Sequence, residues 1–277
     1  MFKRRAINIH PVNMCNYHCP FCFEKMDKKN PKILDYDKLI TFVNDYKPAH
    51  VGICGGEPLL WADLNLFLVW LKQKNITSCL ITNGSLLDEL LTLPNRVSVG
   101  VSNDMEYNTA IVNFINNNLE YAKESVEITI TPTDLTKVEG LISAFSTLGI
   151  KYINISLLAF WNKNSVVLDL IDDTYIENLI TILSEERDIP ITTFGENNHN
   201  RIRAFYKKEN IPNAEYVCYA PLNIYSDGKL SFCDIGNNMI PSMNINTNYN
   251  INELDILRVA QFNETPSCKA CSLRRVL

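Results

Sequence analysis

Three cysteines near the start of the chain have the spacing of an iron–sulfur site. Cys15, Cys19 and Cys22 form the pattern Cys-x3-Cys-x2-Cys on one short segment. Thiolates are the usual protein ligands of a four-iron cluster, which takes four of them. Three thiolates leave one iron open to a small chelating molecule. The alternative is a zinc loop with Cys54, Cys79 or His18 as the fourth ligand.

A glycine pair follows the second predicted strand, which ends at Cys54. The run Gly55-Gly56-Glu57-Pro58 lies where ligands bind in α/β sheets, at the carboxyl end of a parallel strand. Glycines at such a place allow a ligand to approach the backbone closely. The pair comes one strand after the cysteine segment, so both should lie at the same edge of the sheet.

A second group of cysteines lies in the last quarter of the chain. Cys218 and Cys233 flank a predicted hairpin, and Cys268 and Cys271 follow much later. Two pairs of cysteines fit a zinc ribbon as well as a fully ligated iron–sulfur cluster. These four residues alone do not separate the two alternatives.

Alternating strand and helix patterns would position the first group. Six apolar runs rich in Ile and Val predict buried parallel strands at Ala6–Pro11, His50–Cys54, Cys79–Thr82, Val97–Ser102, Val126–Thr131 and Tyr152–Leu158. Helical patterns follow them at Asp35–Tyr46, Ala62–Lys74, Leu86–Leu93, Tyr107–Lys123, Leu135–Leu148 and Thr174–Glu186. Asp35 and Thr174 are expected to be N-caps, and Gly149 to end the fifth helix.

These units predict an α/β fold, a partial (βα)6 barrel of parallel strands followed by a small α+β iron–sulfur domain. A hairpin is expected at Leu222–Tyr225 and Lys229–Cys233, joined by Ser226-Asp227-Gly228. The predicted boundary places residues 1–199 in the barrel and 200–277 in the small domain.

The composition is that of an ordinary globular protein. Of 277 residues, 46% are hydrophobic and 21% charged, and the formal net charge is −5. Interspersed charges of both signs argue against a nucleic-acid or membrane binder. No signal peptide or membrane span is found, so we expect a cytoplasmic protein whose nine cysteines stay reduced.

The first cysteine segment and the glycine loop together resemble the radical S-adenosylmethionine (SAM) superfamily. Phe21 before Cys22, Thr82-Asn83-Gly84 and Ser102-Asn103-Asp104 also fit that pattern over residues 6–160. The resemblance implies that the three cysteines hold a [4Fe–4S] cluster whose free iron chelates SAM. It further implies a site for the methionine amino group around Gly55, Gly56 and Glu57, an adenine contact by Phe21, a ribose contact by Ser102, and weaker SAM contacts by Thr82, Asn83 and Asp104. Relatives often carry an arginine after the fourth strand, and residues 105–123 have none.

The second cysteine group resembles the twitch domain, the short form of the SPASM auxiliary-cluster extension. This resemblance implies a second [4Fe–4S] cluster held by Cys218, Cys233, Cys268 and Cys271. Because no cysteine follows Cys271, we expect one auxiliary cluster rather than two. Four protein ligands would close it to substrate and suit it to electron transfer or structural support.

Several residues near the predicted site have two interpretations. Cys54 is a hydrogen-atom donor or a small buried side chain, and we favour packing. Cys79 is expected in the core, and His10 as a structural histidine. Tyr152, Asn154 and Ser156 alternate on one face of the sixth strand and are candidate substrate contacts; Phe160 and Trp161 are candidates for the cavity rim.

The resemblance implies reductive cleavage of SAM to a 5′-deoxyadenosyl radical that abstracts a substrate hydrogen. A peptide is the favoured substrate, with oxidation, crosslinking or epimerisation as outcomes, and a small molecule such as a sugar alcohol or antibiotic precursor is the alternative. The first strand begins near residue 6, which predicts no separate leader-binding domain. A flavodoxin-type reductase is the expected electron donor. A non-catalytic zinc or iron–sulfur scaffold is the rival from another class.

Overall fold

The computed structural model describes residues 6–22, 24, 26–27, 29–101, 109–158, 171–193, 202–203, 206, 216–218, 221–232, 239–254 and 274–276. At 216–218, 239, 241–242 and 274–276 it describes the backbone alone.

A ten-stranded sheet forms the centre of the molecule, in the order β11-β10-β9-β1-β2-β3-β4-β5-β6-β7. The strands from β9 to β7 in this order all run parallel, and β10 and β11 are antiparallel additions at one end. The strands are β1 Ala6–Ile9, β2 His50–Ile53, β3 Thr77–Thr82, β4 Arg96–Val101, β5 Val126–Ile130, β6 Tyr152–Ile155, β7 Ile191–Thr192, β9 Leu222–Ile224, β10 Lys229–Ser231 and β11 Met239–Asn244. A separate pair joins β8 Tyr216–Cys218 to β12 Arg274–Val276.

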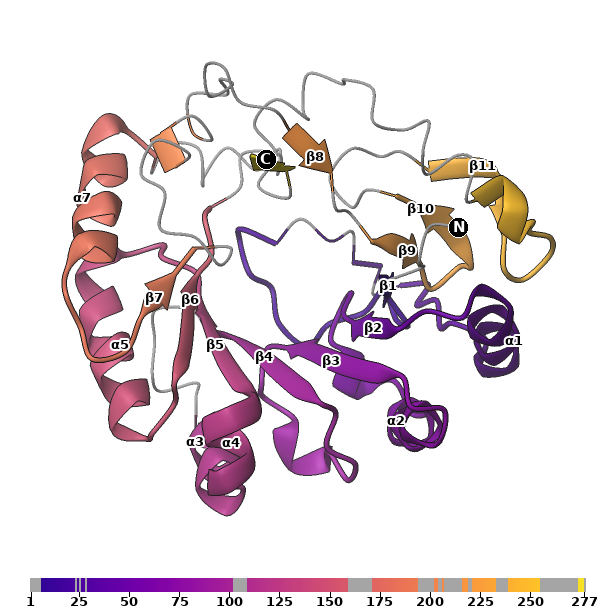
Figure 1. Ribbon diagram of the computed structural model, residues 1–277, viewed down its shortest axis with the longest axis horizontal. Coiled ribbons are helices and arrows are strands. Elements are labelled where there is room, and N and C mark those ends of the chain that lie inside the picture. Colours follow the sequence, from indigo (N-terminus) through magenta and orange to yellow (C-terminus); the bar gives the residue numbers. More distant parts are fainter. Residues whose placement is uncertain are drawn as a thin grey trace.

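The sheet curves, and the helices cover its convex side (Figure 1). Because these strands run parallel, their carboxyl ends lie along one rim of the sheet, as in an open barrel. The helices are α1 Tyr36–Tyr46, α2 Leu64–Gln73, α3 Thr109–Asn117, α4 Leu119–Ser125, α5 Val138–Thr147 and α7 Asp173–Ser184, with single 3-10 turns at Pro58–Leu60, Leu87–Glu89 and Leu135–Lys137. The α/β class and the mostly parallel sheet confirm the predicted fold class.

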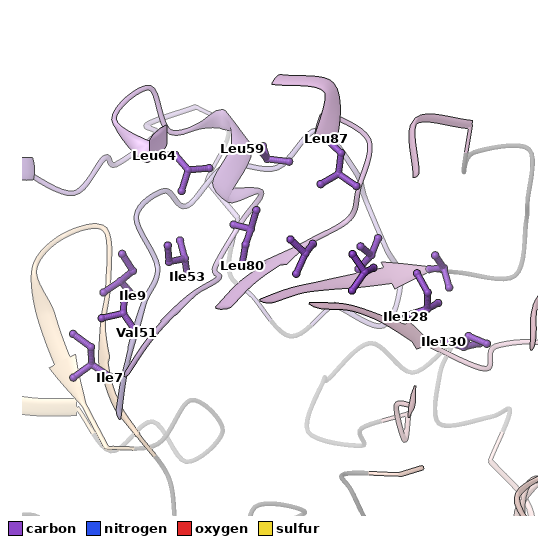
Figure 2. Packing of buried hydrophobic residues seen from close by; sticks show 14 of the residues in the cluster. Ile7, Ile9, Val51, Ile53, Leu59, Leu64, Leu80, Leu87, Ile128 and Ile130 are labelled. Atoms are coloured by element: carbon purple, nitrogen blue, oxygen red, sulfur yellow. The ribbon is translucent and has the colours of Figure 1, made fainter. Parts of the chain in front are cut away.

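The main core lies between the sheet and these helices. Figure 2 shows strand side chains such as Ile9, Ile53 and Leu80 on one side of the sheet, with Leu59 and Leu64 from the following segments near them. The three strand residues are completely buried. Burying a side chain of this size stabilises the fold by roughly 1.5–3 kcal/mol. This apolar layer fixes the rim from which the site residues project.

The predicted ends of two helices are confirmed. The Asp35 carboxylate accepts a hydrogen bond from the Lys38 N–H, 3.0 Å away, and caps α1. Gly149 has a φ of +82° and donates its N–H to Ser146 O after α5. The prediction of Thr174 as N-cap is wrong. The Asp172 side chain accepts from the Tyr175 N–H at 2.7 Å and caps α7, which begins at Asp173.

Two predicted helices are wrong in extent. Leu86–Leu93 contains only the turn Leu87–Glu89, because the Asn65 side chain accepts from the N–H groups of Leu91 and Thr92 and holds an irregular segment. The predicted helix Tyr107–Lys123 is broken between α3 and α4 at Asn118, whose side chain donates to Phe114 O. Asparagine is a poor helix former, and three of them stand in a row here.

The predicted hairpin exists as β9 and β10, but it does not stand apart from the barrel. β9 pairs in parallel with β1, so the C-terminal part of the chain extends the same sheet. The strands β7, β8, β11 and β12 were not predicted, and the sixth strand ends at Ile155 rather than Leu158. The division at residue 200 stays a prediction.

Across the described part of the chain, no helix combines the length and apolar character that a membrane span requires.

Candidate functional site

The cysteine segment is a long loop closed at its base beside β1. Val12 pairs with Ile33 in an isolated antiparallel bridge, and Leu34 donates its N–H to Pro11 O at 2.8 Å. The Asn13 side chain accepts from the Lys32 N–H at 2.6 Å. The loop that carries Cys15, Cys19 and Cys22 is thus fixed at both ends to the carboxyl end of a central strand.

The three thiols lie close enough to influence one another. Burial raises the pKa of Cys19 most, and the thiols of Cys22 and Cys15 raise it further. The pKa of Cys22 is also raised, chiefly by burial, while the backbone N–H of Glu24 lowers it. All three side chains are half-buried. A bound iron favours the thiolate form, so it would offset the cost of deprotonating thiols whose pKa is raised.

This donor set fits a four-iron cluster. Three sulfurs share one loop, and N–H groups point at two of them: Tyr17 N lies 3.4 Å from Cys15 Sγ, and Glu24 N bonds to Cys22. In the described residues no three His, Cys, Asp or Glu side chains are close enough to hold a single ion. The sulfurs of a cubane bind different irons, so they stand farther apart than ligands that share one metal. His18, the suggested fourth zinc ligand, is exposed.

The glycine pair packs against the cysteine loop. A Cβ on Gly56 would lie 1.9 Å from Met14 O, and one on Gly55, with its φ of +104°, would lie 2.9 Å from the His10 backbone. The N–H groups of Gly56 and Glu57 donate to Val12 O and Met14 O at 3.1 and 2.9 Å. Only side-chain-free residues allow this approach. Since these N–H groups are used, the carbonyl oxygens are what remain to receive an amino group.

Glu57 joins two strand ends through a buried carboxylate. Its oxygens accept from the Thr82 hydroxyl at 2.7 Å, the Asn83 N–H at 2.9 Å and the Leu59 N–H at 3.1 Å. The residue is 1% exposed, and burial raises its pKa while the three hydrogen bonds lower it. The Thr82 hydroxyl also accepts from Gly84 N, so Thr82 connects the Glu57 carboxylate to the backbone that follows β3.

The remaining predicted cofactor contacts are placed in part. Phe21 is half-buried and packs against the core. Ser102 and Asp104 lie outside the described residues, as do Phe160 and Trp161. Of the second cysteine group only the backbone of Cys218 is described, in β8, while Cys233, Cys268 and Cys271 also lie outside. Their roles stay predictions.

Cys54 and His10 contact each other where β1 and β2 end. Cys54 Sγ lies 3.6 Å from His10 Nε2, and His10 Nδ1 lies 2.9 Å from a carboxylate oxygen of Glu24. The His10 ring stacks on Tyr225 of the C-terminal hairpin, 4.6 Å between centroids. Neither Glu24 nor Tyr225 is among the site residues predicted from the sequence. The position of Glu24, two residues after Cys22, was the only available signal for it.

A polar face lies on the concave side of the sheet, opposite the main core. Arg96 and Glu127 pair at 3.4 Å, and the Arg96 guanidinium lies 5.3 Å from the centre of the Tyr152 ring. The Ser98 and Thr129 hydroxyls are 3.2 Å apart. We call the following residues the concave polar face: Arg96, Ser98, Glu127, Thr129, Tyr152 and Asn154.

The predicted alternation of Tyr152 and Asn154 is confirmed by this face, which is half-exposed. Their proposed contact with substrate stays a prediction. Cys79 is half-buried here rather than in the core, because its neighbours Ser78 and Leu80 fill the buried side of β3. Burial raises its pKa to about 11, with Arg96 opposing the increase and Glu127 adding to it. Arg96 and Glu127 were missed because their approach depends on strand register.

Comparisons with known proteins agree with this geometry. Residues 9–128 match the family model of the radical SAM superfamily. The chain is 33% identical over 88 residues to an S-adenosylmethionine-dependent nucleotide dehydratase of a Thermoplasmatales archaeon, covering 31% of this chain and 32% of that protein. It is 33% identical over 94 residues to a GTP 3′,8-cyclase of Aliarcobacter butzleri, covering 30% and 28%. Each match thus spans about a third of the relative's length.

The fold resembles a solved structure over nearly its whole length. Streptococcus suis SuiB bound to S-adenosylmethionine superposes with a TM-score of 0.62 at 17% identity, covering 97% of this chain and 70% of that one. SuiB bound to its precursor peptide SuiA gives 0.60 at 15% identity, covering 96% and 66%. Together with the cysteine loop closed at the end of β1, the family match identifies residues 9–128 as a radical SAM superfamily domain.

Proposed function

We propose that this chain is a radical SAM enzyme that modifies a peptide by hydrogen-atom abstraction. The observation that carries the proposal is the packing of the cysteine loop against Gly55 and Gly56 at the carboxyl rim of a parallel sheet. When bound, a [4Fe–4S] cluster with SAM supplies the 5′-deoxyadenosyl radical. The protein supplies the ligands, the orientation and the exclusion of water.

The residues of the rim divide these tasks. Cys15, Cys19 and Cys22 would hold the cluster with one iron free for SAM. Glu57 fixes the loop after β2 to the end of β3 through Thr82 and the Asn83 N–H. We assign the methionine amino group to the carbonyls of the glycine loop. Phe21 and Ser102 keep their predicted contacts with the adenine and the ribose, and Asp104 keeps its weaker predicted contact with SAM.

We propose an auxiliary [4Fe–4S] cluster held by Cys218, Cys233, Cys268 and Cys271. The pairing of Cys218 with Arg274 across β8 and β12 supports this set, because Arg274 follows Cys271 by only three residues. A cluster with four protein ligands would accept an electron from a substrate radical. A flavodoxin-type donor in the cytoplasm would supply the first electron.

Two observations support a peptide. The fold likeness extends over almost the whole chain to SuiB, whose structure was solved with a precursor peptide. The concave polar face also offers both charges and hydroxyls, which suit a peptide backbone with polar side chains. The named relatives support the alternative, a nucleotide or another small molecule.

The substrate classes can be separated by the formation of 5′-deoxyadenosine. Reconstituted protein would be assayed without oxygen, with SAM and a reductant, against peptides encoded beside the gene and against nucleoside triphosphates and sugar alcohols. We expect a peptide to stimulate turnover and to gain a mass change. Stimulation by a nucleotide and by no peptide would overturn the assignment.

Two substitutions that each remove one positive charge, Arg96→Gln and Arg187→Gln, test the role of the concave polar face in substrate binding. Arg96→Gln should raise KM for the stimulating substrate and leave substrate-free cleavage of SAM unchanged. Arg187 provides the matched control, since it pairs with Glu139 and Glu185 away from that face. Equal effects of Arg96→Gln and Arg187→Gln would remove the concave polar face from substrate binding.

A further inference from the structure

The side chain of Asn83 reaches from the end of β3 to the first cysteine. Its Nδ2 lies 3.7 Å from Cys15 Sγ and 2.9 Å from the side-chain oxygen of Asn16. Its Oδ1 lies 2.9 Å from the Ser85 N–H and 2.6 Å from the Ser85 hydroxyl. Asn16 completes the ring by donating to that hydroxyl at 2.8 Å.

This network fixes which end of the amide faces the sulfur. A backbone N–H can only donate, so the Asn83 atom that faces Ser85 N must be the oxygen. The amide nitrogen therefore points at Cys15. It carries two hydrogens, of which Asn16 takes one and Cys15 Sγ faces the other.

The backbone of Asn83 is fixed as firmly as its side chain. Its N–H donates to the buried Glu57 carboxylate at 2.9 Å. The donor is thus held from one side by Glu57, in the loop after β2, and from the other by Ser85. An N–H donor held in place in this way needs little rearrangement when the charge on the sulfur changes.

We propose that Asn83 sets the reduction potential of the SAM-binding cluster by donating a hydrogen bond to the Cys15 thiolate. Hydrogen bonds to cluster sulfurs are among the factors that set such potentials. A donor stabilises the more negative, reduced state, so it makes the cluster easier to reduce. The Tyr17 N–H, 3.4 Å from the same sulfur, acts in the same direction. This inference rests on the proposed function.

The rival explanation is that Asn83 only ties the cysteine loop to β3. Asn16 separates the two explanations, because Asn16→Ala removes the tie and leaves the Asn83 amide facing Cys15. Asn83→Ala removes both the tie to Asn16 and the amide donor that faces Cys15. Asn83→Ser is a second variant, whose hydroxyl is too short to span the distance to the sulfur.

The test is an EPR-monitored redox titration of the reconstituted full-length protein. The relevant cluster is recognised because its signal changes when SAM is added. For Asn83→Ala and Asn83→Ser we expect the ratio of reduced to oxidised cluster, at the wild-type midpoint, to fall about tenfold, which is about 59 mV for one electron. Asn16→Ala should titrate like the wild type.

Two results would overturn the proposal. One is an unchanged midpoint in an Asn83 variant that keeps its cluster; the other is an Asn16→Ala shift as large as that of Asn83→Ala. If Asn83→Ala loses the cluster, Asn83→Ser decides in the same way. A wild-type protein without any SAM-responsive signal would instead contradict the proposed function.

Discussion

Cys54 Sγ lies 3.6 Å from His10 Nε2, where the ends of β1 and β2 meet below the glycine loop. His10 is 3% exposed, and its imidazole contacts the Glu24 carboxylate and stacks on the Tyr225 ring. A thiol in this position packs against a buried ring and has a proton-exchanging neighbour. Both interpretations of Cys54, packing and hydrogen donation, therefore have a physical basis.

We predict that packing is its role. Cys54→Ala should lower the free energy of unfolding by about 1 kcal/mol, as for a small, half-buried side chain, and leave the identity of the product unchanged. Chemical denaturation of the variant and mass spectrometry of the product check the two parts. Turnover in deuterated water is the decisive control: a solvent deuteron on the product carbon, absent with Cys54→Ala, would establish hydrogen donation.

A neutral side chain of the same shape should not replace the Glu57 carboxylate without a loss of stability. Glu57→Gln places one amide NH2 against a backbone or hydroxyl donor, so a buried donor loses its acceptor. The expected cost is about 1–3 kcal/mol in the free energy of unfolding. Thr82→Val, which removes one of the three donors to Glu57, is the matched comparison and should cost less. Equal stability of Glu57→Gln and wild type in urea denaturation would show that the carboxylate is not needed.

Cys79 should react slowly with alkylating reagents. With a pKa of about 11 it is almost entirely protonated at pH 8, so its alkylation should be roughly a hundredfold slower than that of an unperturbed thiol. The rate should rise with pH up to about 11. Site-resolved mass spectrometry after timed labelling measures it, with a cysteine-containing peptide as reference.

The neighbours of Cys79 provide paired controls of opposite sign. Glu127→Gln removes a negative charge that disfavours the thiolate, so the pKa should fall and labelling at pH 8 should be faster. Arg96→Gln removes a positive charge that favours the thiolate, so labelling should be slower. A fast reaction in the wild type, or the same direction for both variants, would contradict the placement of these groups around the thiol.

The fold was predictable because its signals are local. Runs of Ile and Val marked the six central strands, and Asp35 and Gly149 marked helix ends through their own side-chain or backbone chemistry. Asp172 and Asn118 show the limit of such signals. At Asp172 two neighbouring residues could cap, and at Asn118 a side chain competes with the helix for a carbonyl.

The site was predictable only where its motif is contiguous. Two motifs are contiguous in the sequence and can be recognised there: the spacing of Cys15, Cys19 and Cys22, and the run from Gly55 to Glu57. The contacts of Asn83 with Cys15 and of Tyr225 with His10 join segments that are distant in sequence. They depend on which strands lie side by side, and the parallel pairing of β9 with β1 was not predictable from local patterns.

The second cluster should be separable from the first. Cys218→Ala or Cys271→Ala should lower the iron content of reconstituted protein from about eight to about four per chain, since each cluster holds four. Cleavage of SAM should persist, because the first cluster is intact, while product formation should fall. Full product formation by a variant shown to lack that iron would make the auxiliary cluster dispensable.

Formation of 5′-deoxyadenosine by the Cys15→Ala/Cys19→Ala/Cys22→Ala variant tests the central claim most directly. The wild type and the variant would be reconstituted without oxygen, assayed with SAM and a reductant, and analysed for iron. We predict that the variant keeps about four irons in its second cluster and forms no 5′-deoxyadenosine, whereas the wild type forms it. Wild-type protein that binds only zinc, or a triple variant that still forms 5′-deoxyadenosine, would contradict the claim.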